Sequence, residues 1–332
     1  MGRFFLTAKG FFTDKGFLSK AKGFLTAKGV VSKAKGLYLT ILASMVFSGE
    51  LMAMQTYANQ INESSWRVRS SVFSCELVHQ VPYYGDVVFR TRAGEASASY
   101  LRAKTSRFRA GEADIVARSP VWVAQPEEQT LASVGMKRGT RPLWLSSGIT
   151  ERILASLKQG FDIELRGEAW YQQPAPAAKL QVSTIGFQEV YEQYLGCLTS
   201  LIPRNFDQLK RTSLLFPGGL VDELPRSAIS QLDRILELVK HDAKVRFFYI
   251  DGHADSVGDR DENLELSQAR AELVAQYLKR RGVPADWITL RWHGERYPVV
   301  SNATATGRAK NRRVTVRLER VEEIEVLPLA AN

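Results

Sequence analysis

The stretch Asp251–Gly258 reads DGHADSVG and directly follows the apolar run Val245–Ile250, which predicts a buried strand. Because the stretch is polar and ends in glycine, it is typical of a turn. Downstream, residues Asn263–Arg281 carry apolar side chains at spacings of three and four, which predicts a helix. Asp255 therefore belongs to the turn and Arg270 to the helix. We expect the end of the strand to present one carboxylate and one guanidinium side by side.

The segments around this stretch predict an α+β domain with helices packed on a mixed sheet. The order is strand, helix, strand, helix, strand, strand, and we assign the domain to residues 203–320, followed by an acidic-to-apolar tail at 321–332. The remaining elements are strands at Thr212–Phe216, Ile288–Trp292 and Val314–Leu318 and an amphipathic helix at Ser227–His241. The side chains of the second helix expected to face the core are Leu266, Leu273, Val274, Tyr277 and Leu278.

A carboxylate and a guanidinium in one opening suit a zwitterionic ligand. The carboxylate of Asp255 can accept hydrogen bonds from an ammonium group, and the guanidinium of Arg270 can fork onto a carboxylate. Without a ligand, the same two residues would form an ordinary salt bridge. The residues alone leave both interpretations open.

Residues 54–202 predict a mostly β domain, because short apolar or alternating runs are separated by polar and glycine positions. From Phe187 to Leu201 the apolar spacing becomes helical, and Cys197 falls on this helix. Ile202–Asn205 is typical of a linker. The expected strands are Ser65–Val72, Asp86–Thr91, Ala113–Arg118, Val121–Ala124 and Phe161–Leu165.

Residues 1–53 carry eight basic and two acidic side chains, and so contribute +6 to the formal net charge of +10. The apolar run at 37–47 follows Lys33 and Lys35 and precedes small residues, a pattern typical of a cleaved secretory signal peptide. A membrane-spanning helix needs about 20 apolar residues, which is more than this run offers. Residues 1–36 repeat Lys-Gly pairs, which indicates either a translated DNA repeat upstream of the true start or a basic arm for a membrane surface.

Export would place Cys75 and Cys197, the two cysteines of the chain, in an oxidising compartment where they can pair. Such a bond would connect the helix at Phe187–Leu201 to an early strand. The alternative is two free cysteines buried as small apolar side chains.

The C-terminal half resembles the OmpA-like peptidoglycan-binding domain family. The resemblance rests on the turn at residues 251–255, on the NLELSQARA stretch at 263–271, on GERYP at 294–298 and on NRRV at 311–314. It implies that Asp255 and Arg270 bind the zwitterionic end of diaminopimelate in the peptidoglycan stem peptide, and that Asn263 and Arg312 shape or line the pocket. Ala254 replaces the family's usual threonine, and Trp292-His293-Gly294 replaces the usual Gly-x-Gly, so affinity could be lower than in the family at large.

The wider chain is similar to MotY-like proteins of sodium-driven polar flagellar motors, on the stretches at residues 248–253, 277–282 and 290–298. The resemblance implies a periplasmic location at the basal body and outer membrane, a disulfide in the first domain, and no cofactor. It also implies three partners besides peptidoglycan: MotX, the basal-body ring proteins and the sodium-driven stator complex. A generic cell-wall anchor of the OmpA family without a motor role is the alternative.

Two other functions find less support in the sequence. A hydrolytic metal site could be built from Asp251, His253, Asp255 and His293, but no His-Glu-x-x-His motif is present and the chain has only four histidines. The basic run Arg308–Arg313 could contact nucleic acid, but the glutamates at 319–325 would repel a phosphate backbone. We therefore expect neither a bound metal nor a nucleic-acid partner, and we expect no enzyme activity.

Overall fold

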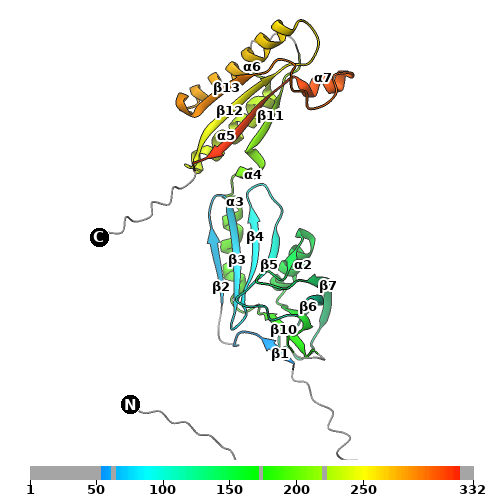
Figure 1. Cartoon of the computed structure of the whole chain (residues 1–332). Coiled ribbons are helices and arrows are strands. Elements are labelled where there is room, and N and C mark those ends of the chain that lie inside the picture. The colour runs from blue at the N-terminus through cyan, green and yellow to red at the C-terminus, as the bar shows by residue number, and fades with distance from the viewer. Residues whose placement is uncertain (1–53, 61–64, 172–174, 219–222, 322–332) are drawn as a thin grey trace, which may run out of the picture. The chain divides into compact units, whose positions relative to one another are not determined.

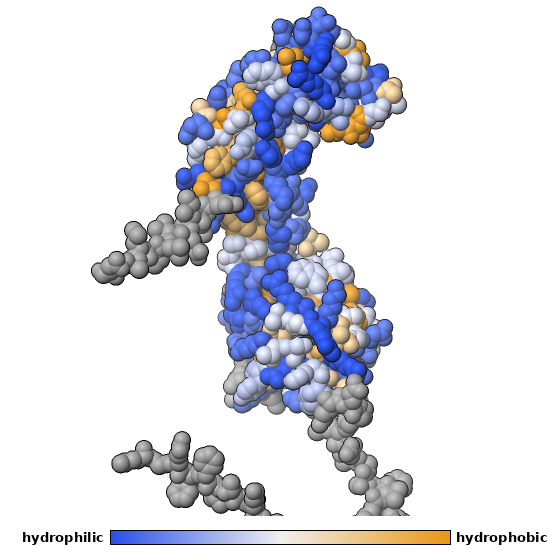
Figure 2. Space-filling model, in the orientation of Figure 1, coloured by the Kyte–Doolittle hydropathy of each residue, from blue (hydrophilic) through white to orange (hydrophobic). Residues whose placement is uncertain are grey.

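The computed structural model describes residues 54–60, 65–171, 175–218 and 223–321 (Figure 1). The predicted signal peptide, the repeats of residues 1–36 and all but the first residue of the predicted tail lie outside these ranges. In the described part of the chain, no helix is both long enough and apolar enough to span a bilayer. The surface shown in Figure 2 is mostly hydrophilic, with apolar residues scattered over it.

Among the described residues of the N-terminal half there are two five-stranded sheets and two helices. In one sheet, neighbouring strands all run antiparallel, whereas in the other sheet β1 pairs with β10 in parallel and the remaining pairs are antiparallel. The first sheet has the order β2 (Trp66–Ser70), β3 (Ser74–Val81), β4 (Gly85–Arg92), β5 (Ala98–Ala103), β8 (Trp144–Leu145). The second has the order β1 (Gln55–Tyr57), β10 (Ala177–Val182), β9 (Asp162–Glu168), β6 (Gly111–Arg118), β7 (Glu128–Met136).

One apolar core joins the two sheets to α2 (Ser147–Lys158) and α3 (Phe187–Thr199). Alternating residues of the strands supply it, as Leu77 and Phe89 do from the first sheet, because successive side chains on a strand point to opposite faces. The structure joins Cys75 on β3 to Cys197 on α3 by a disulfide, in agreement with the predicted link between the helix and an early strand.

The strand predicted at Val121–Ala124 is wrong. These residues form an exposed turn between β6 and β7, in which the backbone N–H of Val123 donates to the carbonyl of Pro120 (3.0 Å). Proline offers no N–H to a strand ladder, and three consecutive apolar residues cannot all face one core. The strand expected near Cys75 is β3, and the sequence analysis gave no bounds for β1, β5, β7, β8, β10 and α2.

The C-terminal half is a four-stranded mixed sheet with α5 (Arg226–His241) and α6 (Arg260–Arg280) contributing to the same apolar core. This confirms the predicted fold class. The strand order is β11 (Arg211–Leu215), β14 (Arg313–Arg320), β12 (Val245–His253), β13 (Ile288–Trp292), and only β12 and β13 are parallel. The short helices are α4 (Phe206–Leu209), η1 (Ala285–Trp287) and α7 (Ala305–Asn311).

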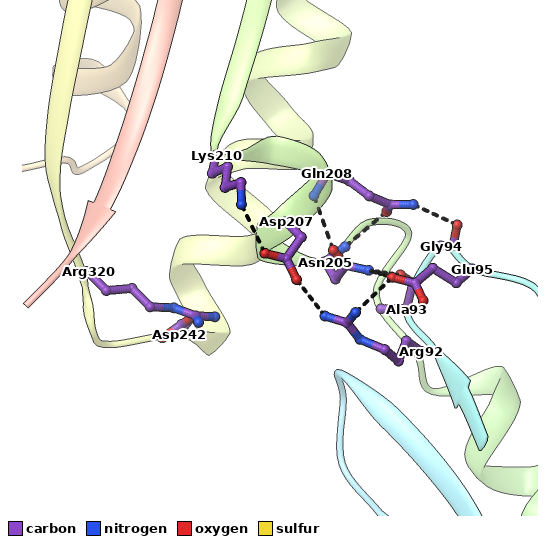
Figure 3. Close-up of polar contacts among 10 residues, drawn as sticks. All are labelled: Arg92, Ala93, Gly94, Glu95, Asn205, Asp207, Gln208, Lys210, Asp242 and Arg320. Carbon is purple, nitrogen blue, oxygen red and sulfur yellow. Dashed lines mark hydrogen bonds and ion pairs between the residues drawn. The ribbon is translucent and has the colours of Figure 1, made fainter. Parts of the chain in front are cut away.

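A network of hydrogen bonds holds the linker segment before β11 against the turn between β4 and β5 (Figure 3). Asn205 and Gln208 form a reciprocal capping box at the start of α4. The side-chain amide of Asn205 also donates to the carbonyl of Ala93 (2.9 Å) and to a carboxylate oxygen of Glu95 (2.6 Å). The amide of Gln208 donates to the carbonyl of Gly94 (2.8 Å). The capping residues of α4 thereby also satisfy the backbone of a distant turn.

Gly94→Ala tests this contact. Gly94 has φ +70°, and an added Cβ would lie 2.4 Å from Oε1 of Gln208 and 2.7 Å from the carbonyl oxygen of Pro203. We expect the free energy of unfolding to fall by more than the ~1–2 kcal/mol that a left-handed backbone alone costs a non-glycine residue. Gly282→Ala is the control, since Gly282 has φ +97° and no neighbour within 4 Å of its added Cβ. If chemical denaturation gave both variants the same loss in free energy of unfolding, the tight contact at Gly94 would be contradicted.

The imidazole of His79 on β3 is buried, and its ring packs edge-on against Trp66 at 4.6 Å between centroids. Burial lowers the pKa of His79 to about 3. Because the unfolded chain takes up this proton near pH 6.5, protonation favours unfolding as the pH falls below that value. We expect the free energy of unfolding to drop between pH 6.5 and 4, by up to ~1.4 kcal/mol per pH unit from this residue. In His79→Gln the slope of stability against pH should be shallower by that amount; an unchanged slope would show that His79 does not titrate in this way.

Candidate functional site

The candidate site lies where β12 ends and the chain turns back through α6. Phe248 and Ile250 of β12 are fully buried in the core, and Asp255 follows two residues after the strand. Because α6 packs along β12 and β13, residues in its first turns lie close to this strand end.

The face of α6 that points inward differs from the prediction. Leu266 and Leu273 are only partly buried, whereas the polar residues Asn263, Ser267 and Arg270 are buried. In the first half of α6 the inward face therefore carries polar groups, which meet the loops at the strand ends instead of the apolar core. Sequence periodicity missed this because it places apolar residues inside and assigns polar ones to the surface.

Close contact between helix and strand depends on Gly252. A Cβ at this position would lie 2.0 Å from the carbonyl oxygen of Ser267, so any side chain would push α6 away. The hydroxyl of Ser267 accepts a hydrogen bond from the backbone N–H of Gly294 (3.0 Å) and donates to the carbonyl of Leu264 (2.8 Å). Ser267 thus ties α6 to the loop after β13, a positioning role that the sequence analysis did not assign.

Asp255 is 8% exposed and has both carboxylate oxygens engaged. One oxygen accepts from Nη1 of Arg312 (2.8 Å), and the other accepts from the backbone N–H of Val257 (3.1 Å). The partner of Asp255 in this ion pair is Arg312, whereas the sequence pointed to Arg270.

Arg270 is a fully buried cation in the same site. Its Nη1 donates to the carbonyl of His253 (3.3 Å), and its guanidinium carbon lies 5.6 Å from the ring centroid of Phe216. Burial, with the nearby charge of Arg312, lowers the pKa of Arg270 to about 10, while the charge of Asp255 raises it. Arg270 therefore remains positive at neutral pH, and the carboxylate of Asp255 lies in the field of two guanidinium groups.

Asn263 and Arg312, the two other predicted site residues, connect segments around this pair. The amide of Asn263 donates to the carbonyl of Val257 (3.2 Å) and to a carboxylate oxygen of Glu295 (3.1 Å), which ties the loop after β12 to the loop after β13. Arg312 follows α7 and also donates to the carbonyl of Phe216 (3.4 Å). The structure thus brings all four predicted residues to one end of the sheet.

The comparisons with known proteins follow this division into two halves. Residues 57–203 match the MotY N-terminal domain, and residues 221–312 match the OmpA family. The chain joins a MotY N-terminal domain to an OmpA-family domain. Over 85% of its length it is 26% identical to the sodium-type flagellar protein MotY of Vibrio parahaemolyticus, of which it covers 97%.

Other relatives match a smaller part of the chain. The peptidoglycan-binding protein ArfA of Mycobacterium tuberculosis is 44% identical over 26% of this chain, and the matched segment spans 26% of ArfA. The outer-membrane lipoprotein YfiB of Pseudomonas aeruginosa is 41% identical over 30% of this chain, which spans 58% of YfiB. Among solved structures, the C-terminal domain of Helicobacter pylori MotB is 21% identical and covers 33% of this chain and 85% of that domain, with a TM-score of 0.31.

Two histidines lie beside the site in the OmpA-family domain. The rings of His253 and His293 stack at 5.0 Å between centroids, and Nε2 of His293 lies 3.3 Å from a carboxylate oxygen of Asp251. Burial, with the nearby charges of Arg313 and His293, lowers the pKa of His253 to about 4, so its ring is neutral at neutral pH. Asp255, the fourth residue considered for a metal site, is engaged with Arg312 instead. Within the described ranges, no group of three or more His, Cys, Asp or Glu residues is arranged to hold a metal ion.

The basic run Arg308–Arg313 is mostly occupied in internal contacts. Arg308 donates to the carbonyl of Asn302 (3.0 Å), and Arg313 is buried and donates to the carbonyl of Tyr297 (3.1 Å). Asn311 is fully buried, and its side chain bonds the backbone N–H of Val299 (2.9 Å) and the carbonyl of Val300 (2.8 Å). The asparagine of the NRRV stretch thus fixes the loop at residues 299–302 to the end of α7, directly before Arg312.

Proposed function

We propose that this chain is a periplasmic anchor that fixes a flagellar motor ring and its stator to peptidoglycan. The two halves would have different roles. The OmpA-family domain would hold the cell wall, and the MotY N-terminal domain would dock on the basal body. The observation that carries the proposal is Asp255 after the end of β12, paired with Arg312 and within the field of the buried Arg270.

The ligand would be the zwitterionic end of diaminopimelate in the stem peptide. Its ammonium would meet the carboxylate of Asp255, and its carboxylate would meet the guanidiniums of Arg270 and Arg312. Charge-assisted hydrogen bonds of this kind are strong when the partners are held in place beforehand. Asn263 would keep the loop after β12 in position. Similarity to ArfA, which is named as peptidoglycan-binding, supports this ligand.

The relatives support a proposal for the partners and the compartment. The similarity to a sodium-type flagellar MotY over 85% of the chain supports a role in sodium-driven rotation. MotX, the basal-body ring proteins and the stator complex are the partners that this role implies, and the periplasmic side of the outer membrane is the location. An anchor of this kind acts by binding, so we propose neither an enzyme activity nor a cofactor.

Asp255→Asn and Arg270→Lys test the pocket. Each should reduce sedimentation with isolated peptidoglycan roughly tenfold or more, because a charge-assisted hydrogen bond contributes about 1.5–3 kcal/mol. Asp251→Asn is the matched control, since Asp251 pairs with Arg291 and His293 outside the pair of interest. Circular dichroism and thermal melting would establish that the variants fold. Folded variants that sediment like the wild type would refute this pocket.

A generic cell-wall anchor remains the second candidate, because the OmpA family is matched independently of the MotY domain. Deletion of the gene separates the two. A motor anchor predicts cells that carry flagella which do not rotate, seen by electron microscopy and by tethered-cell assays. Normal rotation together with a weakened envelope would favour the generic anchor.

A further inference from the structure

The first sheet of the N-terminal half has an outward face rich in arginine. Side chains alternate along each strand, so the residues between the buried core positions of β2 to β5 point away from the core. We use the term arginine face for Arg67, Arg69, Arg90, Arg102, Arg141 and Trp144. The disulfide, the core and the OmpA-family site do not involve these side chains.

The two carboxylates on this face are already engaged. Asp86 accepts from Arg67 (3.1 Å) and from Arg102 (2.8 Å). Glu76 lies 3.7 Å from the guanidinium of Arg69 and accepts from the hydroxyl of Tyr100 (3.3 Å). Three of the five arginines thus already have a carboxylate partner within the sheet, and two of the three share Asp86.

Arg90 and Arg141 have aromatic neighbours instead. The rings of Tyr100 and Trp144 stack in parallel, 4.9 Å apart and 4° from coplanar. The guanidinium carbon of Arg90 lies 5.4 Å from the Tyr100 centroid and 5.3 Å from that of Trp144, and the guanidinium carbon of Arg141 lies 5.8 Å from the Tyr100 centroid. Within the described part of the chain, neither arginine forms an ion pair with a carboxylate.

This arrangement prepares the two guanidiniums for an external anion. Cation–π stacking holds a guanidinium over a ring but leaves N–H donors available for a carboxylate. A side chain that is already ordered loses less entropy when a partner binds. Trp144 is 53% exposed beside them and offers an apolar contact. Tryptophan, tyrosine and arginine are the residues that dominate binding energy at protein interfaces.

We propose that the arginine face docks an acidic segment of a partner protein. Carboxylates of that segment would meet Arg90 and Arg141, and one of its apolar side chains would cover Trp144. The strands of this sheet contain no lysine. Protein interfaces favour arginine and disfavour lysine, whereas anionic lipid surfaces attract both, so the composition favours a protein. The arginine face would be the surface through which the N-terminal half docks on the basal body, and this inference rests on that proposed function.

The test uses a fluorescein-labelled octaglutamate peptide and the full mature chain, with binding measured by fluorescence anisotropy at low and physiological salt. Arg90→Glu/Arg141→Glu should weaken binding at least tenfold, and Trp144→Ala should weaken it several-fold. The matched control is Arg152→Glu/Arg226→Glu, which makes the same change in net charge at two exposed arginines and should stay within twofold of the wild type. Equal weakening in both double variants, or no binding at all, would overturn the proposal.

Two further measurements would reveal whether something other than a partner protein binds the arginine face. Vesicles containing phosphatidylglycerol that bind through Arg90 and Arg141, when octaglutamate does not, would favour a lipid surface and overturn the proposal. A chain ending at Arg320 lacks Glu322, Glu323 and Glu325. If octaglutamate binds this shorter chain tenfold more tightly, the chain's own tail covers the face and the proposal is wrong; unchanged binding supports it. Peptidoglycan sedimentation of Arg90→Glu/Arg141→Glu should match the wild type, so failure here is distinguishable from failure of the OmpA-family site.

Discussion

The close contact between α6 and β12 is the constraint on which the site depends. The helix approaches the strand at Gly252, where no Cβ intervenes, and Ser267 fixes the helix to the loop after β13. This contact sets the depth of Arg270 and hence the position of a buried positive charge. A buried cation is stable only where hydrogen bonds and an opposite charge compensate for lost hydration. The carbonyl of His253 and the field of Asp255 supply part of that compensation.

Arg312 changes the interpretation of the charge pair. The sequence analysis pairs Asp255 with Arg270 and gives Arg312 a role in shaping or lining the pocket, whereas in the structure it is Arg312 that contacts Asp255 directly. A ligand ammonium that approaches Asp255 must compete with Arg312 or share the carboxylate with it. The carboxylate group of a zwitterion would find two cations at the same end of the sheet. In the proposed mode, binding would exchange one ion pair for two, which favours ligands that carry both charges.

Most of the C-terminal half could be predicted from the sequence because its elements have clear periods. The runs at Val245–Ile250 and Ser227–His241 have strong strand and helix patterns, and the structure has both. The inward polar face of α6 could not be derived this way, because Asn263, Ser267 and Arg270 break the apolar pattern that identifies buried residues. In the N-terminal half, Val121–Val123 are apolar enough to predict a strand, but in the structure they do not pair with any strand. The partner of Asp255 lies 57 residues away, a separation that no local pattern reveals.

The disulfide between Cys75 and Cys197 would have a mechanical consequence in the proposed anchor. The bond closes a covalent loop with a sequence separation of 122 residues, which includes most strands of the N-terminal half. Tension applied between the chain before Cys75 and the chain after Cys197 passes through the sulfur atoms and bypasses that loop. A pull from the cell wall would reach β3 directly through the end of α3, so the strands between the two cysteines would not be peeled away from their C-terminal end.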